Sequence, residues 1–345
     1  MVKENQELLR IRIDKSNKIR STIKRFYIYI FLFLIVVLFS VLKLDQVELF
    51  ERGHFLNPYS IINLLRIAVP ILILSGGFTL LMISGYIDLS VGSAMSLSAV
   101  VFALMIRSNI AFPLAIMISI VLGIGMGAFN GLLVMRFRIT PVIATLVTLN
   151  LFKGIALLIV PDGVSSIRGS DTTPMPDLIN NFARKNLFLG LPSAFYAAIL
   201  VIIILVIVQR KTILGKYAAV IGGNPIAAEL SGINAVKIVW ILYIIVGVLA
   251  ALAGAARASY MSFGDPLSGD GMELDCIIAV LLGGTAFSGG EGSVAKTIVG
   301  ALIIICVTTG LMTVIPAFWQ TVAKASVLLI AVVLNHLLVR EKKLV

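Results

Sequence analysis

One stretch of the sequence has residue types and spacing that could bind a nucleotide. Residues 290–297 read GEGSVAKT, one residue away from the phosphate-binding loop G-x-x-x-x-G-K-[ST], because Ala295 stands where the second glycine is required. Such a loop works only between a strand and a helix of an α/β domain, whereas here apolar stretches lie on both sides. We therefore expect no ATP hydrolysis by this chain and interpret its glycines as a tight turn beside a broken helix. They are Gly283, Gly284, Gly289, Gly290 and Gly292.

Two acidic segments beside apolar stretches are the next candidates for chemistry. Asp88 lies in SGYIDLSVGS and Asp275 in MELDCIIAVLLGGTAFSGGEGS. A carboxylate so close to the bilayer is costly unless it is satisfied, and at a helix start it can accept backbone N–H bonds and complement the helix dipole. Two interpretations of Asp88 stay open, a cap that holds a broken helix and a group that lines or gates a path. The predicted set for this region is Asp88, Ser90, Gly92, Asp275, Gly283, Gly284 and Thr285.

The composition indicates where these segments lie. Of the 345 residues, 59% are hydrophobic and 13% are charged, whereas a soluble domain has about 45–50% and about 25%. The excess of apolar residues must face lipid. The net charge is +11, but the basic residues gather at the ends of apolar stretches, which indicates membrane topology rather than a nucleic-acid partner. The isolated Cys276 and Cys306 predict buried packing, and no metal or cofactor site is expected.

Ten stretches predict membrane helices, because a helix needs about 20 apolar residues to cross the bilayer. With both termini in the cytoplasm, most basic residues fall on the inner side. We therefore predict an all-α polytopic membrane protein, built from two five-helix halves, with a basic cytoplasmic segment 1–25, a transmembrane domain 26–338 and a cytoplasmic tail 339–345. The predicted spans are 26–44, 62–84, 89–106, 113–135, 141–160, 193–209, 238–260, 274–288, 297–314 and 318–338.

Two loops are too long to be mere connectors, and long loops in compact domains are usually functional or disordered. The outer one is 161–192 and the inner one is 210–237. In the inner loop, Pro225 suits the first turn of a short helix and Gly232 suits its end. This spacing predicts a short helix at the cytoplasmic face.

Three stretches together resemble the permease subunits of bacterial monosaccharide ABC importers, of the ribose, xylose and galactose type. They are SGYIDLSVGS (84–93), LGKYAAVIGGNPIAAELSGI (214–233) and MELDCIIAVLLGGTAFSGGEGS (272–293), and the likeness runs from residue 55 to 338. Nucleoside and branched-chain amino acid permeases share weaker versions of the first and third. The resemblance implies that 26–338 is a permease domain in the bacterial cell membrane, with a helical fold similar to the cobalamin importer's permease. It implies three partners, an ABC ATPase subunit, an extracytoplasmic sugar-binding protein and a second permease copy, identical or paralogous.

The resemblance also assigns roles to the two long loops. The inner loop would couple to the ATPase, and the outer loop, with 263–273, would receive the binding protein through exposed charges. The coupling set is Gly222, Gly223, Asn224, Pro225, Ala227, Ala228, Glu229, Ser231 and Gly232. The docking set is Arg168, Arg184, Lys185, Asp265 and Asp270.

Other residues within the predicted spans have simpler interpretations. We expect Lys153, Lys324 and Arg257 to reach toward the membrane interface rather than to pair inside it. The glycines of the fourth span, Gly123, Gly125, Gly127 and Gly131, predict close helix packing. Hydrogen-bonding groups for a sugar path could come from Asn130, Thr145, Thr148, Asn150, Ser259, Thr308 and Thr309.

These observations predict a transporter and not an enzyme. The predicted function is the membrane subunit of an ABC importer that carries a neutral monosaccharide inward, driven by ATP hydrolysis on partner subunits. One alternative is a permease of the same class for nucleosides or branched-chain amino acids. Another is an ion-coupled secondary sugar transporter, which would need an intramembrane acid such as Asp88 but has no need of a cytoplasmic docking helix.

Overall fold

The computed structural model describes residues 28–41, 55–160, 165–166 and 185–314, with single positions between 319 and 329. In this part of the chain, six helices are long and apolar enough to cross a membrane, and three shorter helices are also apolar. The helices are Ile28–Val41, α2 (Pro58–Ile83), α3 (Val91–Arg107), α4 (Phe112–Gly131), α5 (Pro141–Ile159), α7 (Ser193–Lys211), α8 (Ile213–Gly223), α9 (Pro225–Leu230), α10 (Ala235–Met261), α11 (Met272–Leu282) and α12 (Val294–Val314). A π-helix at Leu132–Arg136, a 3-10 helix at Phe188–Gly190 and the strands β1 (Ser165–Ser166) and β2 (Phe263–Gly264) complete the set.

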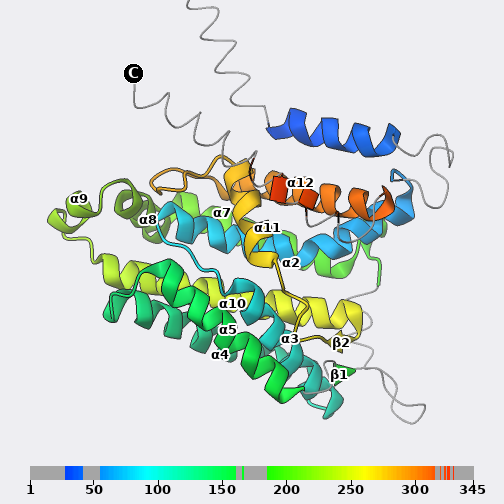
Figure 1. Ribbon diagram of the computed structural model, residues 1–345, viewed down its shortest axis with the longest axis horizontal. Coiled ribbons are helices and arrows are strands. Elements are labelled where there is room, and N and C mark those ends of the chain that lie inside the picture. Colours follow the sequence, from blue (N-terminus) through cyan, green and yellow to red (C-terminus); the bar gives the residue numbers. More distant parts are fainter. Residues whose placement is uncertain are drawn as a thin grey trace, which may run out of the picture.

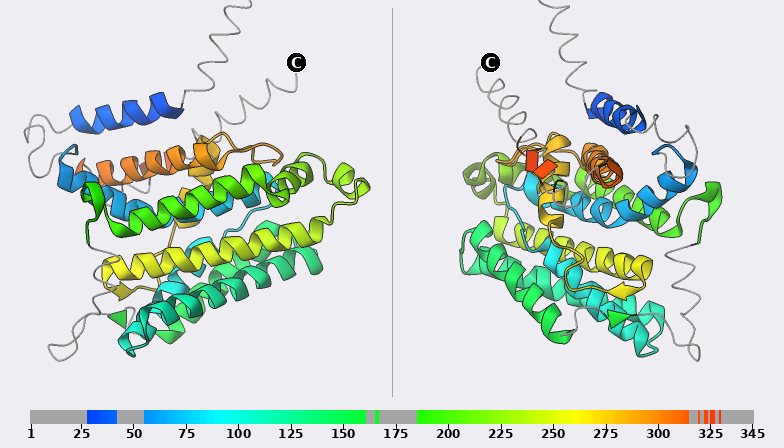
Figure 2. Two further views of the ribbon diagram at one scale, coloured as in Figure 1. Left: turned by 180° about the vertical axis from the view of Figure 1, so that it is seen from behind. Right: turned by 45° about the vertical axis from the view of Figure 1, so that its right-hand side comes forward.

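The long helices form two layers that run in nearly the same direction (Figures 1 and 2). One layer contains α2, α7 and α12, and the other contains α3, α4, α5 and α10, with α2 packed against α10 across the boundary. Helix α11 crosses steeply from one layer toward the other (Figure 2). Helix α9 projects at one end of the bundle, and the paired strands β1 and β2 lie at the opposite end. We call these the α9 end and the strand end.

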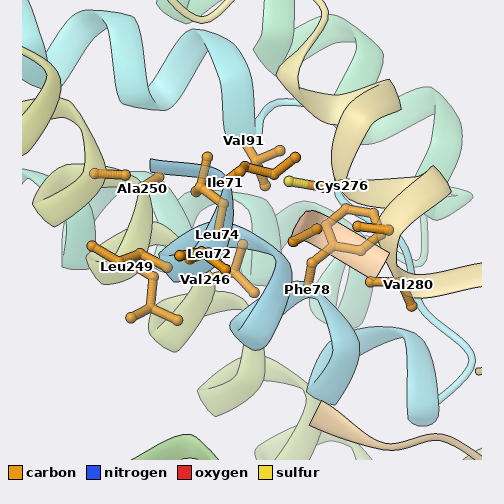
Figure 3. Packing of buried hydrophobic residues seen from close by; sticks show 14 of the residues in the cluster. Ile71, Leu72, Leu74, Phe78, Val91, Val246, Leu249, Ala250, Cys276 and Val280 are labelled. Atoms are coloured by element: carbon orange, nitrogen blue, oxygen red, sulfur yellow. The ribbon is translucent and has the colours of Figure 1, made fainter. Parts of the chain in front are cut away.

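Helix α2 forms the centre of the core. Its side chains lie between those of α10 and those of α11, where Phe78 and Leu72 are completely or almost completely buried (Figure 3). A helix that is apolar on all sides is a buried or membrane-embedded helix. In contrast, α4, α5 and α7 expose large apolar side chains such as Val121, Val147 and Leu200, which need lipid or another protein to cover them.

Local chemistry explains where several helices begin. The side-chain oxygen of Asn57 accepts a hydrogen bond from the Tyr59 N–H at 2.8 Å, and that of Asn224 accepts one from the Ala227 N–H at 3.0 Å. Both caps precede a proline in the first turn. This combination satisfies an otherwise unpaired backbone donor and fixes the first backbone angle.

The glycines of α4 pack against α10, as the sequence predicts, with one exception. A methyl group at Gly123 or Gly127 would overlap the backbone of α10, and one at Gly131 would overlap the Trp240 ring. Gly125 has open space around it, so the prediction is wrong for this residue. Its position two residues from Gly123 and Gly127 puts it on the other face of the helix.

Two of the expected elements differ in the structure. The predicted span 274–288 is wrong, because α11 ends at Leu282 and its 11 residues cover only about 16 Å, against about 30 Å for the hydrocarbon core. The predicted inner loop 210–237 is mostly helical, because it contains α8, α9 and the first residues of α10. The predicted last span, 318–338, lies mostly outside the described residues.

Candidate functional site

The N-termini of two short helices meet inside the bundle. The first turn of α3 contacts the segment before α11 so closely that a methyl group at Gly92 would overlap the Gly269 carbonyl and touch the Glu273 carboxylate. The Ser96 hydroxyl accepts a hydrogen bond from the Gly269 N–H at 2.8 Å. We call residues 88–96 and 269–275 the α3–α11 junction. Interrupted helices that meet within a membrane are the usual framework of a substrate or ion site.

Asp88 is the centre of a buried polar network at this junction. One carboxylate oxygen accepts hydrogen bonds from the Ser90 N–H at 2.8 Å and the Ser90 hydroxyl at 2.6 Å. The other accepts from the Asn130 amide of α4 at 3.0 Å, and the same amide lies 2.7 Å from the Ser90 hydroxyl. Asp88, two residues before the N-cap Ser90, therefore holds the start of α3 and links this helix to α4. Sequence reasoning placed Asn130 on a sugar path and missed its contact with Asp88.

The acid of the second segment lies inside a helix rather than ahead of it. Asp275 occupies the first turn of α11, where its N–H donates to the Gly271 carbonyl at 3.1 Å and its side chain is buried. Asp275 therefore lies at a helix start, but in the first turn and not at the N-cap, which is Gly271. With Glu273, it adds negative charge to the N-terminal turn of α11, which complements the helix dipole.

Lys153 of α5 reaches the junction. Its ammonium lies 2.6 Å from an Asp270 carboxylate oxygen, with the two side chains 31% and 49% exposed. The sequence analysis did not expect this carboxylate partner for Lys153. Asp270 therefore differs from Asp265, the other acid of the docking set, because it forms an ion pair with Lys153 of α5. Lys324 lies outside the described residues, and Arg257 has Tyr260 and Asp265 as electrostatic neighbours.

The glycine-rich turn lies near the α9 end, where it packs on residues 83–85 rather than on Asp88 itself. Gly284, Gly289 and Gly290 have positive φ angles, and Gly283 packs directly on the backbone of Thr297. The structure therefore divides the predicted Asp88 set in two, because Gly283, Gly284 and Thr285 belong to this turn. The turn follows helix α11, which confirms the broken-helix interpretation of GEGSVAKT.

Thr297, the threonine of GEGSVAKT, forms hydrogen bonds inside the protein. Its hydroxyl is buried, donates to the Ser293 carbonyl at 3.1 Å and lies 2.9 Å from the Thr79 hydroxyl of α2. A phosphate-binding loop would turn this hydroxyl toward a nucleotide-bound metal ion. Here it joins α12 to α2.

Helix α9 confirms the predicted short helix after Pro225. Ala228 is completely buried against the rest of the chain, whereas Ile226 and Leu230 are 72% and 85% exposed. Glu229 and Ser231 are exposed beside them. Ala228 therefore anchors α9, and the apolar surface belongs to two residues that sequence reasoning missed. The sequence did contain a signal for them, because Ile226 and Leu230 are large apolar residues in a segment with polar and basic neighbours.

At the strand end, the two predicted docking loops are joined. Strand β1, from the 161–192 segment, pairs antiparallel with β2, with Ser165 opposite Gly264. Lys185 is exposed at this end, and Asp265 bonds to the Leu267 N–H at 2.8 Å. Arg168 and Arg184 lie outside the described residues.

Most polar residues proposed for a sugar path bond within their own helices. The hydroxyls of Thr145 and Ser259 donate to carbonyls one turn earlier, at 2.8 Å and 2.7 Å. Thr148 does the same at 3.2 Å. Asn150 also bonds back, to the Leu146 carbonyl at 3.0 Å, but it remains exposed on the apolar face of α5.

Comparison with known proteins identifies the class. Residues 60–335 match the family model of the branched-chain amino acid transport system permease component. The ribose import permease protein RbsC of Bacillus subtilis is 36% identical over 88% of this chain and 90% of its own length. The galactofuranose transporter permease protein YtfT of Escherichia coli is 33% identical, over 84% and 82%. The L-arabinose ABC transporter permease protein AraH of Azospirillum brasilense is 29% identical, over 87% and 85%. No solved structure matches the chain.

The chain belongs to this family of transport permeases. It is a multi-pass membrane protein, in agreement with its six long apolar helices.

Proposed function

We propose that this chain is the membrane subunit of an ABC importer for a neutral monosaccharide. The sugar would arrive from an extracytoplasmic binding protein, and ATPase subunits would supply the energy. Helix α9 carries the proposal, because it presents exposed Ile226 and Leu230 at one end of a membrane bundle. A transporter that works alone does not need such a docking surface. The relatives named for ribose, galactofuranose and arabinose support a sugar as cargo.

The charges of the junction support a neutral cargo. Asp88 has three hydrogen-bond donors from the chain itself, and Lys153 is paired with Asp270. An ionic cargo would need a charge that is available to it, because burying an unpaired ion is costly. Asp88 and Asp275 would then position α3 and α11 beside the path rather than bind the sugar.

The orientation and the second copy are part of the same proposal. Basic residues near the α9 end, such as Arg210 and Lys211 of α7 and Lys216 of α8, support a cytoplasmic location for this end. On α5, the exposed Asn150 amide lies beside exposed Val147 and Leu151. A polar amide suits a helix contact or an aqueous path better than lipid. We place the second permease copy and the path at this face, in a helical subunit similar to the cobalamin importer's permease.

A reconstituted system tests the function. The permease, its ATPase and its binding protein in liposomes should take up a labelled monosaccharide only when ATP is supplied to the ATPase side. Ribose, xylose, galactose, a nucleoside and leucine would be compared. Uptake without the ATPase, driven by an ion gradient, would contradict the importer. Uptake of leucine or a nucleoside alone would keep the ATP-driven machine and reject the sugar.

Removing the apolar surface of α9 should separate the permease from its ATPase. Burying one large apolar side chain is worth about 1.5–3 kcal/mol, so the double change Ile226→Ser and Leu230→Ser should weaken ATPase binding by about tenfold or more. Co-purification and binding in nanodiscs measure it. Ile213→Ser is the matched control, since Ile213 is 64% exposed on neighbouring α8. Equal binding by the double variant and the control would place the contact elsewhere.

A further inference from the structure

Gln209, in the last turn of α7, holds the start of α12 with both ends of its amide. The side-chain N–H donates to the Gly292 carbonyl at 2.9 Å, and the side-chain oxygen accepts from the Val294 N–H at 2.9 Å. Val294 is the first residue of α12, whose N–H has no partner within the helix. One side chain therefore fixes the turn between α11 and α12 onto the end of α7.

Helix α8 also contacts this turn. Gly215, in its first half, packs on the backbone of Gln209, and Gly222, at its end, packs on the backbones of Ile83 and Gly290. The Gly290 N–H also donates to the Ile83 carbonyl at 2.8 Å. Any side chain at Gly222 would collide with this backbone. The end of α8 thus contacts the turn at 289–294 directly, and its first half supports the turn through Gln209.

Helix α8 is in turn joined directly to α9. Only Asn224 separates the two helices, and its side chain caps α9. Ala228 anchors α9 in the protein interior. Because the two helices are joined this closely, a displacement of α9 also moves α8.

Beyond the turn, the contacts continue to the α3–α11 junction. Gly283 packs on Thr297, and Gly300 packs on the Ala279 carbonyl, so that α11 and α12 touch backbone to backbone. Helix α11 is only 11 residues long and carries Glu273 against Gly92 at its other end. A short helix held this closely moves as one body, because packed interiors transmit strain.

We propose that Gln209 is a positioning residue that transmits movement of α8 and α9 to α11 and α12, and through α11 to the α3–α11 junction. The inference rests on the proposed function for the meaning of that movement. It assigns to a single amide the link between the ATPase side and the interrupted helices. Loss of the link leaves α9 able to bind its partner while α11 no longer follows.

Two substitutions separate the two bonds of the amide. Gln209→Glu keeps the acceptor for the Val294 N–H and loses the donor to the Gly292 carbonyl. Gln209→Met keeps the length and loses both. Ile203→Met on the same helix is the control, because Ile203 is 50% exposed and lies six residues before Gln209.

The main measurement is sugar imported per ATP hydrolysed in the reconstituted complex. We expect the ratio to fall in the order wild type, Gln209→Glu, Gln209→Met, with a loss of about fivefold or more for Gln209→Met, the lower end of typical coupling effects. ATP hydrolysis should stay near the wild-type rate. A merely structural role would lower hydrolysis and uptake in proportion, so an unchanged ratio for Gln209→Met overturns the inference.

Hydrogen exchange of the isolated permease gives a second readout that does not need transport. Amides of residues 290–296 should exchange faster in Gln209→Met and less so in Gln209→Glu, and Ile203→Met should match the wild type. Unchanged exchange overturns the clamp. If the wild-type complex shows no ATP-driven uptake, the proposed function fails, and this exchange result alone decides the inference.

Discussion

The substitution Gly127→Val is expected to greatly reduce the amount of folded permease. The Gly127 Cα lies in the crossing of α4 and α10, where a methyl group would overlap the Tyr243 carbonyl, and Gly247 packs against Gly127 from the other side. Overpacking typically costs about 1–3 kcal/mol, and more where backbone must move. A loss of this size is a large share of the roughly 5–15 kcal/mol that keeps a protein folded.

The neighbouring glycine provides the control. Gly125→Val adds the same side chain to the same helix, but Gly125 is exposed and has open space around it. Size-exclusion profiles after heating in detergent should show a much lower melting temperature for Gly127→Val and a normal one for Gly125→Val. Equal melting temperatures would mean that the two helices do not approach as closely as the contacts at Gly127 require.

This pair of glycines shows what the sequence can and cannot predict. Small residues every four positions predict close helix packing, and this is correct for Gly123, Gly127 and Gly131. The prediction failed at Gly125 because it used composition and not the helical period, which places residue 125 on the opposite face. Which helix fills the groove cannot be read locally, because α10 lies more than a hundred positions further along the chain.

Local chemistry predicts helix ends better than apolar content does. Pro225 and Gly232 correctly bracketed α9, since each acts on the backbone at its own position. The span at 274–288 was wrong because the apolar window extended across Gly283 and Gly284, which turn the chain after Leu282. Glycine is common inside membrane helices, so an apolar window does not recognise it as an end.

The partners of the junction come from distant parts of the chain. Asp88 bonds to Asn130 across 42 positions, and Lys153 pairs with Asp270 across 117. The sequence alone marked Asp88 as costly in a membrane and Asp270 as an exposed docking charge, but it did not show the partner of either. Gln209 was missed because it precedes the basic pair at 210–211, which indicated only the end of a span.

Substitutions at Asp88 should separate its two interpretations. Asp88→Ala removes the acceptor for the Ser90 N–H and for the Asn130 amide in a buried site, and each unsatisfied buried group costs about 1–3 kcal/mol. We expect loss of uptake together with a clear loss of thermal stability. Asn130→Asp should be at least as damaging, because it sets a second carboxylate against Asp88.

Asp88→Asn should be tolerated if Asp88 only holds the start of α3. The new amide oxygen can accept from Ser90, and a 180° rotation of the Asn130 amide would present its oxygen to the new N–H group. Uptake per ATP and melting temperature should then stay close to the wild type. A stable Asp88→Asn protein without uptake would show that the charge itself is needed. That result would favour a gating or ion-coupled role for Asp88 over a structural one, because the geometry of the network would be intact.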